Sequence, residues 1–261
     1  MKTSTTRDSG KSRRARLSCT AVFLWLILWQ VAAWAVNLPL LLPSPAAVLR
    51  RLWELGATLM FWQTVGLSLV RILAGFLGGL ALGSLFAVLA WCSDFAQAMI
   101  RPLVGVLKTT PVASFIILAL VWIRTEYLAT VISMIMMLPL VYHNMKEGLD
   151  SADIQLLEMA KVFSLSPIKT IRACYLPAVR PFFLSAVTSG LGFAWKAGIA
   201  AEVLGRPAIA VGKQIYDAKV YLETTDLFAW TLVVILSSFL LEKSVLILAD
   251  KIGKRQVRKT R

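Results

Sequence analysis

The sequence predicts an all-α, polytopic membrane protein with about six transmembrane helices. Apolar residues make up 58% of its 261 residues, and charged residues make up only 16%. Soluble domains average about 25% charged residues, and a soluble chain of this length buries only about three quarters of its unfolded surface. So much apolar surface requires a lipid environment. The composition therefore excludes a disordered chain, a disulfide scaffold and a soluble fold.

Six apolar stretches are long enough to cross the hydrocarbon core, which takes about 20 helical residues. They cover residues 17–36, 66–90, 103–123, 127–143, 178–201 and 226–249. The first follows a basic tail and could be read as a signal peptide that ends at Ala33-Trp34-Ala35. Its apolar run is longer than the roughly 7–15 residues of a signal core, so we expect an uncleaved anchor.

A short helix is predicted in the crossing between the first two stretches. Ser44 precedes Pro45, which is the order typical of an N-cap residue followed by proline at the first helical position. We expect this helix to lie at the outer interface, with Arg50, Arg51 and Trp53 near the lipid headgroups.

The second stretch carries a small residue at every fourth position. These residues are Gly75, Gly79, Gly83 and Ala87. Such a ridge allows another helix backbone to approach closely. We expect the partner to be a helix of the same chain rather than of a second copy.

Two prolines bracket the start of the third stretch. Pro102 and Pro111 flank Lys108, and each proline removes one backbone hydrogen bond. The pattern predicts a kinked or partly unwound helix at this point.

The distribution of basic residues predicts the orientation in the membrane. With the N-terminus inside, 18 Lys and Arg residues fall on the inner side and 6 on the outer side. The inner segments are 1–16, 91–102, 144–180 and 250–261, and the outer segments are 37–65, 124–126 and 202–225. The positive-inside rule then places both termini in the cytoplasm. The net charge of +14 is explained by this asymmetry, without a nucleic-acid partner.

This pattern divides the chain into three parts. Residues 1–16 and 251–261 are basic cytoplasmic tails, and residues 17–250 form a single transmembrane domain. Within that domain, the cytoplasmic segment 144–177 is neither a short loop nor a soluble domain.

The segment 144–177 predicts two short amphipathic helices. Asp150, Ser151 and Asp153 are favourable at the N-terminus of the first helix. Its apolar positions are Leu156, Met159, Ala160 and Phe163, at helical spacing. The run from Ser164 to Pro167 predicts a turn and a new helix start, and the second helix is expected to stop at Pro177. Such a pair either docks a partner or lies on the lipid surface.

This segment resembles the EAA loop of the membrane subunits of binding-protein-dependent ABC importers. The loop has the pattern EAA-x3-G-x9-I-x-LP. Glu158-Met159-Ala160, Ser164, Cys174 and Leu176-Pro177 occupy the same register, and Pro167 lies between them. Met159, Ser164 and Cys174 depart from the pattern, and Ser164 replaces a glycine that permits a positive φ.

Three other runs resemble the nitrate, sulfonate and taurine branch of this family. They are Leu42-Pro43-Ser44-Pro45, Ser68-Leu69-Val70-Arg71 followed by Gly75-Phe76, and the eight residues from Trp195 to Glu202. The resemblance covers roughly residues 40–250 and implies the fold of a type I ABC importer permease.

The resemblance also implies a function and partners. The chain would form the translocation path for a small anionic, organosulfur or nitrogen solute in the bacterial cytoplasmic membrane. Its loop would contact a separate ABC ATPase, present in two copies, and an extracytoplasmic substrate-binding protein would deliver the solute. A permease homodimer is the simplest assembly, and a heterodimer stays open. The alternative is a secondary transporter without an ATPase, a class that usually shows more intramembrane ionisable residues and inverted repeats.

The chain lacks the residue patterns expected of an enzyme. Gly10-Lys11-Ser12 resembles the end of a phosphate-binding loop, but Thr5 stands where the first glycine is needed. His143 is the only histidine, and the three cysteines have no metal-ligand spacing. We therefore expect no catalytic site, no metal and no cofactor in this chain.

Two ionisable residues near the fifth stretch are candidates for the translocation path. Lys196 and Glu202 are six residues apart, about 240° around a helix, so they do not face each other. An ionisable group at membrane depth usually faces a water-filled cavity or a partner helix. Lys196 is the stronger candidate, whereas Glu202 could simply be exposed at the outer surface.

Overall fold

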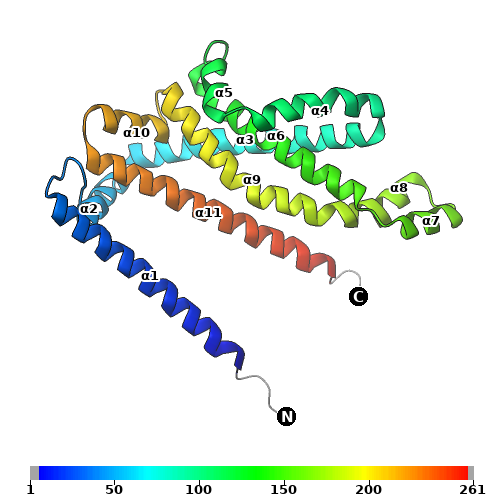
Figure 1. The fold of residues 1–261 in the computed structure, drawn as a ribbon, viewed down its shortest axis with the longest axis horizontal. Coiled ribbons are helices and arrows are strands. Elements are labelled where there is room, and N and C mark those ends of the chain that lie inside the picture. The colour runs from blue at the N-terminus through cyan, green and yellow to red at the C-terminus, as the bar shows by residue number, and fades with distance from the viewer. Residues whose placement is uncertain (1–5, 258–261) are drawn as a thin grey trace.

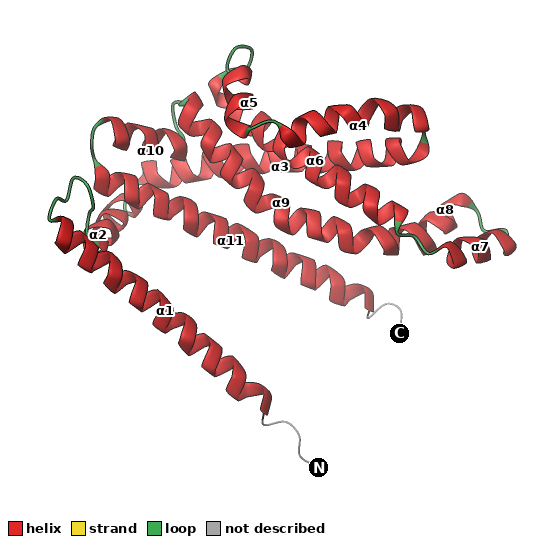
Figure 2. Cartoon of the chain, viewed as in Figure 1, coloured by secondary structure: helices red, strands yellow, loops and turns green. Residues whose placement is uncertain are grey.

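The structure, a computed structural model, describes residues 6–257, with side chains for residues 20–247. Residues 1–5 and 258–261 of the predicted basic tails lie outside the described residues. Every regular element of the described chain is helical (Figures 1 and 2). The elements are α1 (Thr6–Val36), α2 (Pro45–Gly56), α3 (Leu59–Cys92), α4 (Asp94–Thr109), α5 (Val112–Ala119), α6 (Thr125–Asp150), α7 (Ile154–Val162), α8 (Pro167–Thr170), the π-helical turn η1 (Ile171–Tyr175), α9 (Leu176–Gly205), α10 (Val211–Val220) and α11 (Thr224–Val257). The predicted all-α class is confirmed.

Four helical stretches are each long and apolar enough to cross a membrane. They are Leu59–Cys92, Thr125–Asp150, Pro167–Gly205 and Thr224–Ile247, and they correspond to four of the predicted spans. The predicted first span lies in α1, which diverges from the other helices (Figure 1). The indole nitrogen of Trp29 ties α1 to the α1–α2 connection by donating to the carbonyl of Pro43 at 3.1 Å.

The predicted third span, 103–123, is interrupted by a sharp bend, as its two prolines indicate. α4 and α5 meet at an angle of 104°, with Thr110 and Pro111 between them. Thr110 has an extended backbone, with ψ 132°, because the ring of a following proline disfavours helical geometry. The predicted interruption is therefore located at Pro111. Pro102 lies inside α4, which begins earlier than expected, at Asp94.

The small-residue ridge of α3 packs against α6 of the same chain, as expected. A Cβ atom added at Gly79 would lie 2.6 Å from Cβ of Met137, and one at Gly83 would lie 2.7 Å from Cβ of Val141. The two helix backbones are therefore in direct contact, and the ridge is not available to a second copy.

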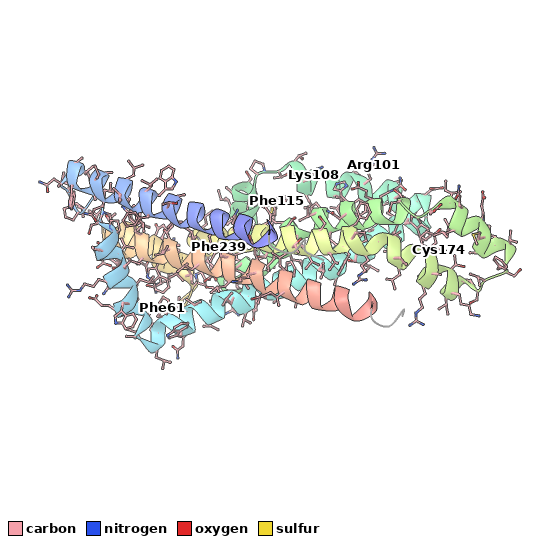
Figure 3. The ribbon with its side chains drawn as sticks, turned by 90° about the horizontal axis from the view of Figure 1, so that it is seen from below. Phe61, Arg101, Lys108, Phe115, Cys174 and Phe239 are labelled. Carbon is pink, nitrogen blue, oxygen red and sulfur yellow. The ribbon has the colours of Figure 1, made fainter. Side chains whose placement is uncertain are left out.

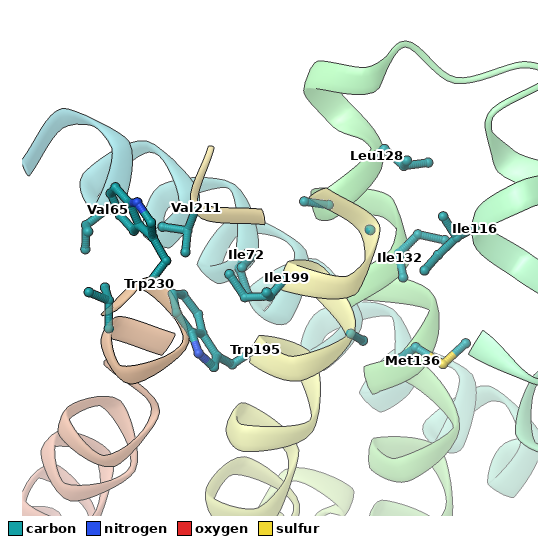
Figure 4. Packing of buried hydrophobic residues seen from close by; sticks show 14 of the residues in the cluster. Val65, Ile72, Ile116, Leu128, Ile132, Met136, Trp195, Ile199, Val211 and Trp230 are labelled. Atoms are coloured by element: carbon teal, nitrogen blue, oxygen red, sulfur yellow. The ribbon is translucent and has the colours of Figure 1, made fainter. Parts of the chain in front are cut away.

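The main hydrophobic core lies where α3, α6, α9 and α11 meet (Figure 4). Trp195 and Ile72 are fully buried there, and Trp230 joins them from α11. The indole nitrogen of Trp195 donates to the carbonyl of Val234 at 3.1 Å, which satisfies its only donor. This core fixes the orientation of α9, the helix that carries both predicted path residues.

The two ends of the molecule carry different short helices. α2 and α10 lie at one end of the long axis, and α7 and α8 lie at the other (Figure 1). At the first end, Ser44 caps α2 by accepting a hydrogen bond from the backbone N–H of Ala47 at 3.3 Å, as predicted. Arg51 of α2 makes two hydrogen bonds to Asp226 of α11, at 2.6 and 2.8 Å. The carboxylate of Asp226 raises the pKa of Arg51 above its ordinary value.

Candidate functional site

The segment between α6 and α9 folds as a helical hairpin. Asp153 caps α7, because its side chain accepts a hydrogen bond from the N–H of Gln155 at 2.9 Å. After α7 the chain reverses direction and starts α8 with Pro167 at the first helical position, as predicted. The hairpin occupies residues 153–175, and Cys174 lies at this end of the molecule (Figure 3).

Ser164 forms the reversal at the end of α7. It adopts the left-handed conformation, with φ 49°. Its N–H donates to the carbonyl of Lys161, and the N–H of Leu165 donates to the carbonyl of Ala160, both at 2.9 Å. These two bonds define a Schellman C-cap, in which glycine is the favoured residue. The glycine of the EAA pattern therefore corresponds to a position that requires a positive φ here.

The buried motif positions hold the hairpin together. Ala160 and Cys174 are 4% and 8% exposed. The thiol of Cys174 donates to the carbonyl of Leu156 at 3.7 Å. Tyr175 also packs edge-on against Trp91 at the end of α3, with ring centroids 4.8 Å apart. The thiol of Cys174 thus joins the π-helical turn η1 to α7.

The remaining motif positions are exposed. Glu158 and Met159 lie on the outer side of α7. Around them the hairpin exposes a set of large apolar side chains: Ile154, Leu156, Met159, Val162, Phe163, Leu165, Ile168 and Ile171. Exposing so many apolar side chains to water is unfavourable, and such a patch typically marks an interaction surface. We call this set the hairpin surface, and it is the part of the predicted loop that is free to bind.

The predicted stop of the second loop helix at Pro177 is wrong. α8 continues through η1 into α9, so Pro177 lies in the first turn of a long helix and not at the end of a short one. The π-helical turn changes the hydrogen-bond register just before the proline, where a missing N–H is tolerated. Leu176 and Pro177 are exposed at this junction.

Glu202 is buried and is not exposed at the outer surface. One carboxylate oxygen accepts hydrogen bonds from the hydroxyl of Ser68 at 2.8 Å and from the N–H of Gly212 at 3.2 Å. The Ser68 hydroxyl also accepts a bond from the N–H of Val211 at 3.0 Å. Arg71 lies 3.9 Å from the other carboxylate oxygen and donates to the carbonyl of Ile209 at 2.7 Å. Two side chains from other helices thus cap the N-terminus of α10.

This burial removes Glu202 from the residues that can face a path in this conformation. The side chain of Glu202 is enclosed by α3, α9 and α10. A Cβ added at Gly212 would lie only 2.5 Å from the Cβ of Glu202. Ser68 and Arg71 belong to a run noted in the sequence, but no local pattern showed that they meet Glu202. They are 134 and 131 residues away from it along the chain.

Lys196 is exposed, on a different side of α9 from Glu202, as the helical spacing predicts. It shares its side with Ser189 and Phe193, at spacings of seven and three residues, and both are also exposed. We call this set the polar face of α9. It borders a pocket at the junction of α4 and α5, to which His143 of α6 also contributes.

The described side chains contain no group of three or more His, Cys, Asp or Glu residues that could hold a metal. Cys92 and Cys174 are both free thiols.

The sequence matches a known family over most of its length. Residues 79–258 match the family described as binding-protein-dependent transport system inner membrane component. A Bacillus subtilis (strain 168) relative, named for aliphatic sulfonates transport, is 27% identical over 88% of this chain and 83% of its own length. The taurine transport system permease protein TauC of Escherichia coli (strain K12) is 24% identical over 88% and 86%.

The fold is similar to that of solved ABC importers. The inward-facing MetNI methionine ABC transporter has a chain that superposes with a TM-score of 0.57, at 18% identity, over 73% of this chain and 93% of that one. An amino acid ABC transporter gives a TM-score of 0.56 over 74% and 90% of the two chains, at 16% identity.

Proposed function

Because the chain belongs to the family of binding-protein-dependent transport system inner membrane components, we propose that it forms the translocation path of an ATP-driven importer for a small anionic solute. Its relatives are transport permeases, and ATP hydrolysis takes place on a separate ATPase subunit. In this proposal residues 17–250 are one permease domain, and segment 144–177 is its coupling loop.

The hairpin surface is the observation that carries this proposal. The C-cap at Ser164 forms its turn, and Ala160 and Cys174 are buried within it. It exposes apolar side chains that the rest of the chain leaves uncovered, with the charged Glu158 among them. These are the properties of a short helix that inserts into a groove of a partner protein. The partner is an ABC ATPase.

The assembly follows from the number of coupling loops. When nucleotide binds, the two ATPase subunits of the importer move together. Each ATPase subunit binds one hairpin, so two permease chains are needed. A homodimer is the simplest solution, and a heterodimer with a sister permease is the other. An extracytoplasmic binding protein delivers the solute to the end that carries α2 and α10.

The orientation in the bacterial inner membrane is supported by the position of the hairpin. Its end of the molecule lies opposite α2 and α10 (Figure 1), and segment 144–180, which includes the hairpin, carries five Lys and Arg residues. Both termini are therefore cytoplasmic in the proposed arrangement.

The solute class is supported by two independent observations. The relatives named for sulfonates and taurine are named for anionic or zwitterionic sulfonates. In this chain the polar face of α9 exposes the cation Lys196 at membrane depth. A cation there suits an anionic solute better than a neutral one, and we assign Lys196 to the lining of the path.

Co-purification with the ATPase tests the proposed coupling. The permease is expressed with a candidate ABC ATPase and binding protein, and the Glu158→Lys variant is compared with the native chain. We expect Glu158→Lys to abolish both co-purification and ATP-dependent uptake, because it reverses the charge on the hairpin surface. Glu223→Lys, which reverses an exposed acid at the opposite end, is the matched control for ATPase binding and should leave co-purification unchanged.

Two outcomes would count against the proposal. If a chain without residues 153–167 still binds the ATPase, the importer function is wrong. If uptake needs no ATPase and stops when the proton gradient is collapsed, the chain is a secondary transporter.

A further inference from the structure

A pocket of about 640 Å³ opens where the bend separates α4 from α5. Its wall comes from three parts of the chain: the α4–α5 junction, α6 and α9. The polar side chains are Lys108, Thr109, Thr110, His143 and Ser189, and apolar side chains such as Phe193 complete the wall. Lys108 lies near the middle of the long axis, between Phe61 at the α2 end and Cys174 at the hairpin end (Figure 3).

The position of these polar groups excludes a lipid-facing surface. Lys108, His143 and Ser189 are exposed in the single chain, and lipid does not satisfy an ammonium group at membrane depth. Such a face lines a water-filled space or contacts a partner subunit. By contrast, the pocket between α3 and α11 is lined almost entirely by apolar residues such as Leu52, Leu236 and Leu240, as a lipid-facing groove would be.

The charge in the pocket is positive and comes from Lys108. None of the pocket's described lining residues is acidic, and no described carboxylate makes an ion pair with Lys108. The two threonine hydroxyls already donate within the end of α4: that of Thr110 donates to the carbonyl of Val106 at 2.8 Å, and that of Thr109 to the carbonyl of Gly105 at 3.1 Å. Lys108 is favourable in the last turn of α4, but that role leaves its ammonium group directed to no acceptor.

We propose that this pocket is an anion-binding site on the translocation path, with Lys108 as the cation that contacts the solute. The ligand is a small organic sulfonate. Its anionic head meets the Lys108 ammonium group, and its apolar part packs against Phe193. The proposal rests on the proposed function, because only a transported solute has reason to reach this depth. Lys196 follows Phe193 on the same side of α9, so the proposal places Lys196 on the same face of the path as the pocket.

Local charge in the pocket can be measured without knowing the natural solute. Cys19, Cys92 and Cys174 are replaced by alanine, and Ser189→Cys is introduced as the reporter. The full-length permease with its ATPase is placed in phosphatidylcholine nanodiscs. The rates of modification are compared for an anionic and a cationic methanethiosulfonate, which carry a sulfonate and a trimethylammonium group respectively.

We expect Lys108→Gln to lower the ratio of anionic to cationic rates about ten-fold, because one positive charge acts in opposite directions on the two reagents. Lys108→Arg should keep the ratio, and Lys219→Gln, at an exposed site on α10, is the matched control. An unchanged ratio in Lys108→Gln overturns the proposal. So does a reporter that neither reagent reaches.

Protection gives a second measurement that needs no change at Lys108. Methanesulfonate should slow the reaction of the Ser189→Cys reporter with N-ethylmaleimide, whereas the neutral isostere dimethyl sulfone should not. Equal effects of the two compounds overturn the proposal. If phosphatidylglycerol added to the nanodisc blocks the anionic reagent, the pocket holds a lipid headgroup and the solute site is wrong. None of these measurements depends on coupling to ATP hydrolysis. A negative result would therefore contradict the anion site without contradicting the proposed importer function.

Discussion

The carboxylate of Glu202 lies 2.8 Å from the hydroxyl of Ser68, although 134 residues separate the two along the chain. Each of these groups also accepts a backbone N–H from the first turn of α10. The N-cap residue of α10, Ala210, has no side chain able to accept a hydrogen bond. Helices α3 and α9 therefore supply the cap that the local sequence lacks, and the outer helix α10 is held to the membrane domain by this contact.

Glu202→Ala should destabilise the protein by about 2–4 kcal/mol, because it leaves the N–H of Gly212 and the hydroxyl of Ser68 buried without their acceptor. The thermal unfolding midpoint in detergent measures the loss. Glu223→Ala removes an exposed acid near the same end and should leave the midpoint unchanged. Equal midpoints for native protein and Glu202→Ala would show that the contact adds nothing to stability.

Ser164→Gly should stabilise the hairpin by about 1 kcal/mol, because glycine adopts a φ of 49° without the steric cost that serine bears. Slower amide hydrogen exchange in α7 measures the gain. Ser166→Gly is the matched control, since Ser166 has a φ of −62° and offers no strain to relieve. Ser164→Pro should have the opposite effect and abolish ATPase binding, because proline cannot adopt a positive φ. Faster exchange in Ser164→Gly would contradict the strain argument.

Cysteines placed at the two ends should differ in their accessibility to an impermeant reagent. In a chain without native cysteines, Glu223→Cys should be labelled from outside intact cells, and Gln155→Cys should be labelled only after permeabilisation. Both positions are exposed, so burial does not affect the comparison. The reverse pattern would invert the orientation and remove the hairpin from the cytoplasm.

Lys196→Ala should reduce uptake of an anionic solute at least several-fold, while the complex still assembles and hydrolyses ATP at its basal rate. Lys196 is exposed and makes no described ion pair, so its removal costs the fold little. Uptake into proteoliposomes and ATP hydrolysis are measured side by side, with Lys196→Arg, which keeps the positive charge, as the control. If the complex dissociates in detergent instead, Lys196 supports the assembly and does not line the path.

Several local features follow from the sequence alone. The apolar stretches, the cap at Ser44 and the start of α8 at Pro167 each depend on residues within one or two helical turns. The same holds for the reversal at Ser164, because a Schellman cap involves only neighbouring residues. The fold class and the hairpin were therefore predictable, since backbone geometry and lipid burial act on short segments.

Long-range relationships were decided by the tertiary structure. The partner of the α3 ridge, the burial of Glu202 and the meeting of Lys108 with Ser189 all join residues far apart in the chain. The unusual residues are visible in the sequence, but their partners are not. The faces of α3, α6 and α9 that meet are set by how their side chains interlock. The sequence also placed a helix end at Pro177, where the π-helical turn lets α9 continue. Local chemistry thus determined the helices and the hairpin, whereas packing determined which ionisable groups were enclosed and which were left exposed.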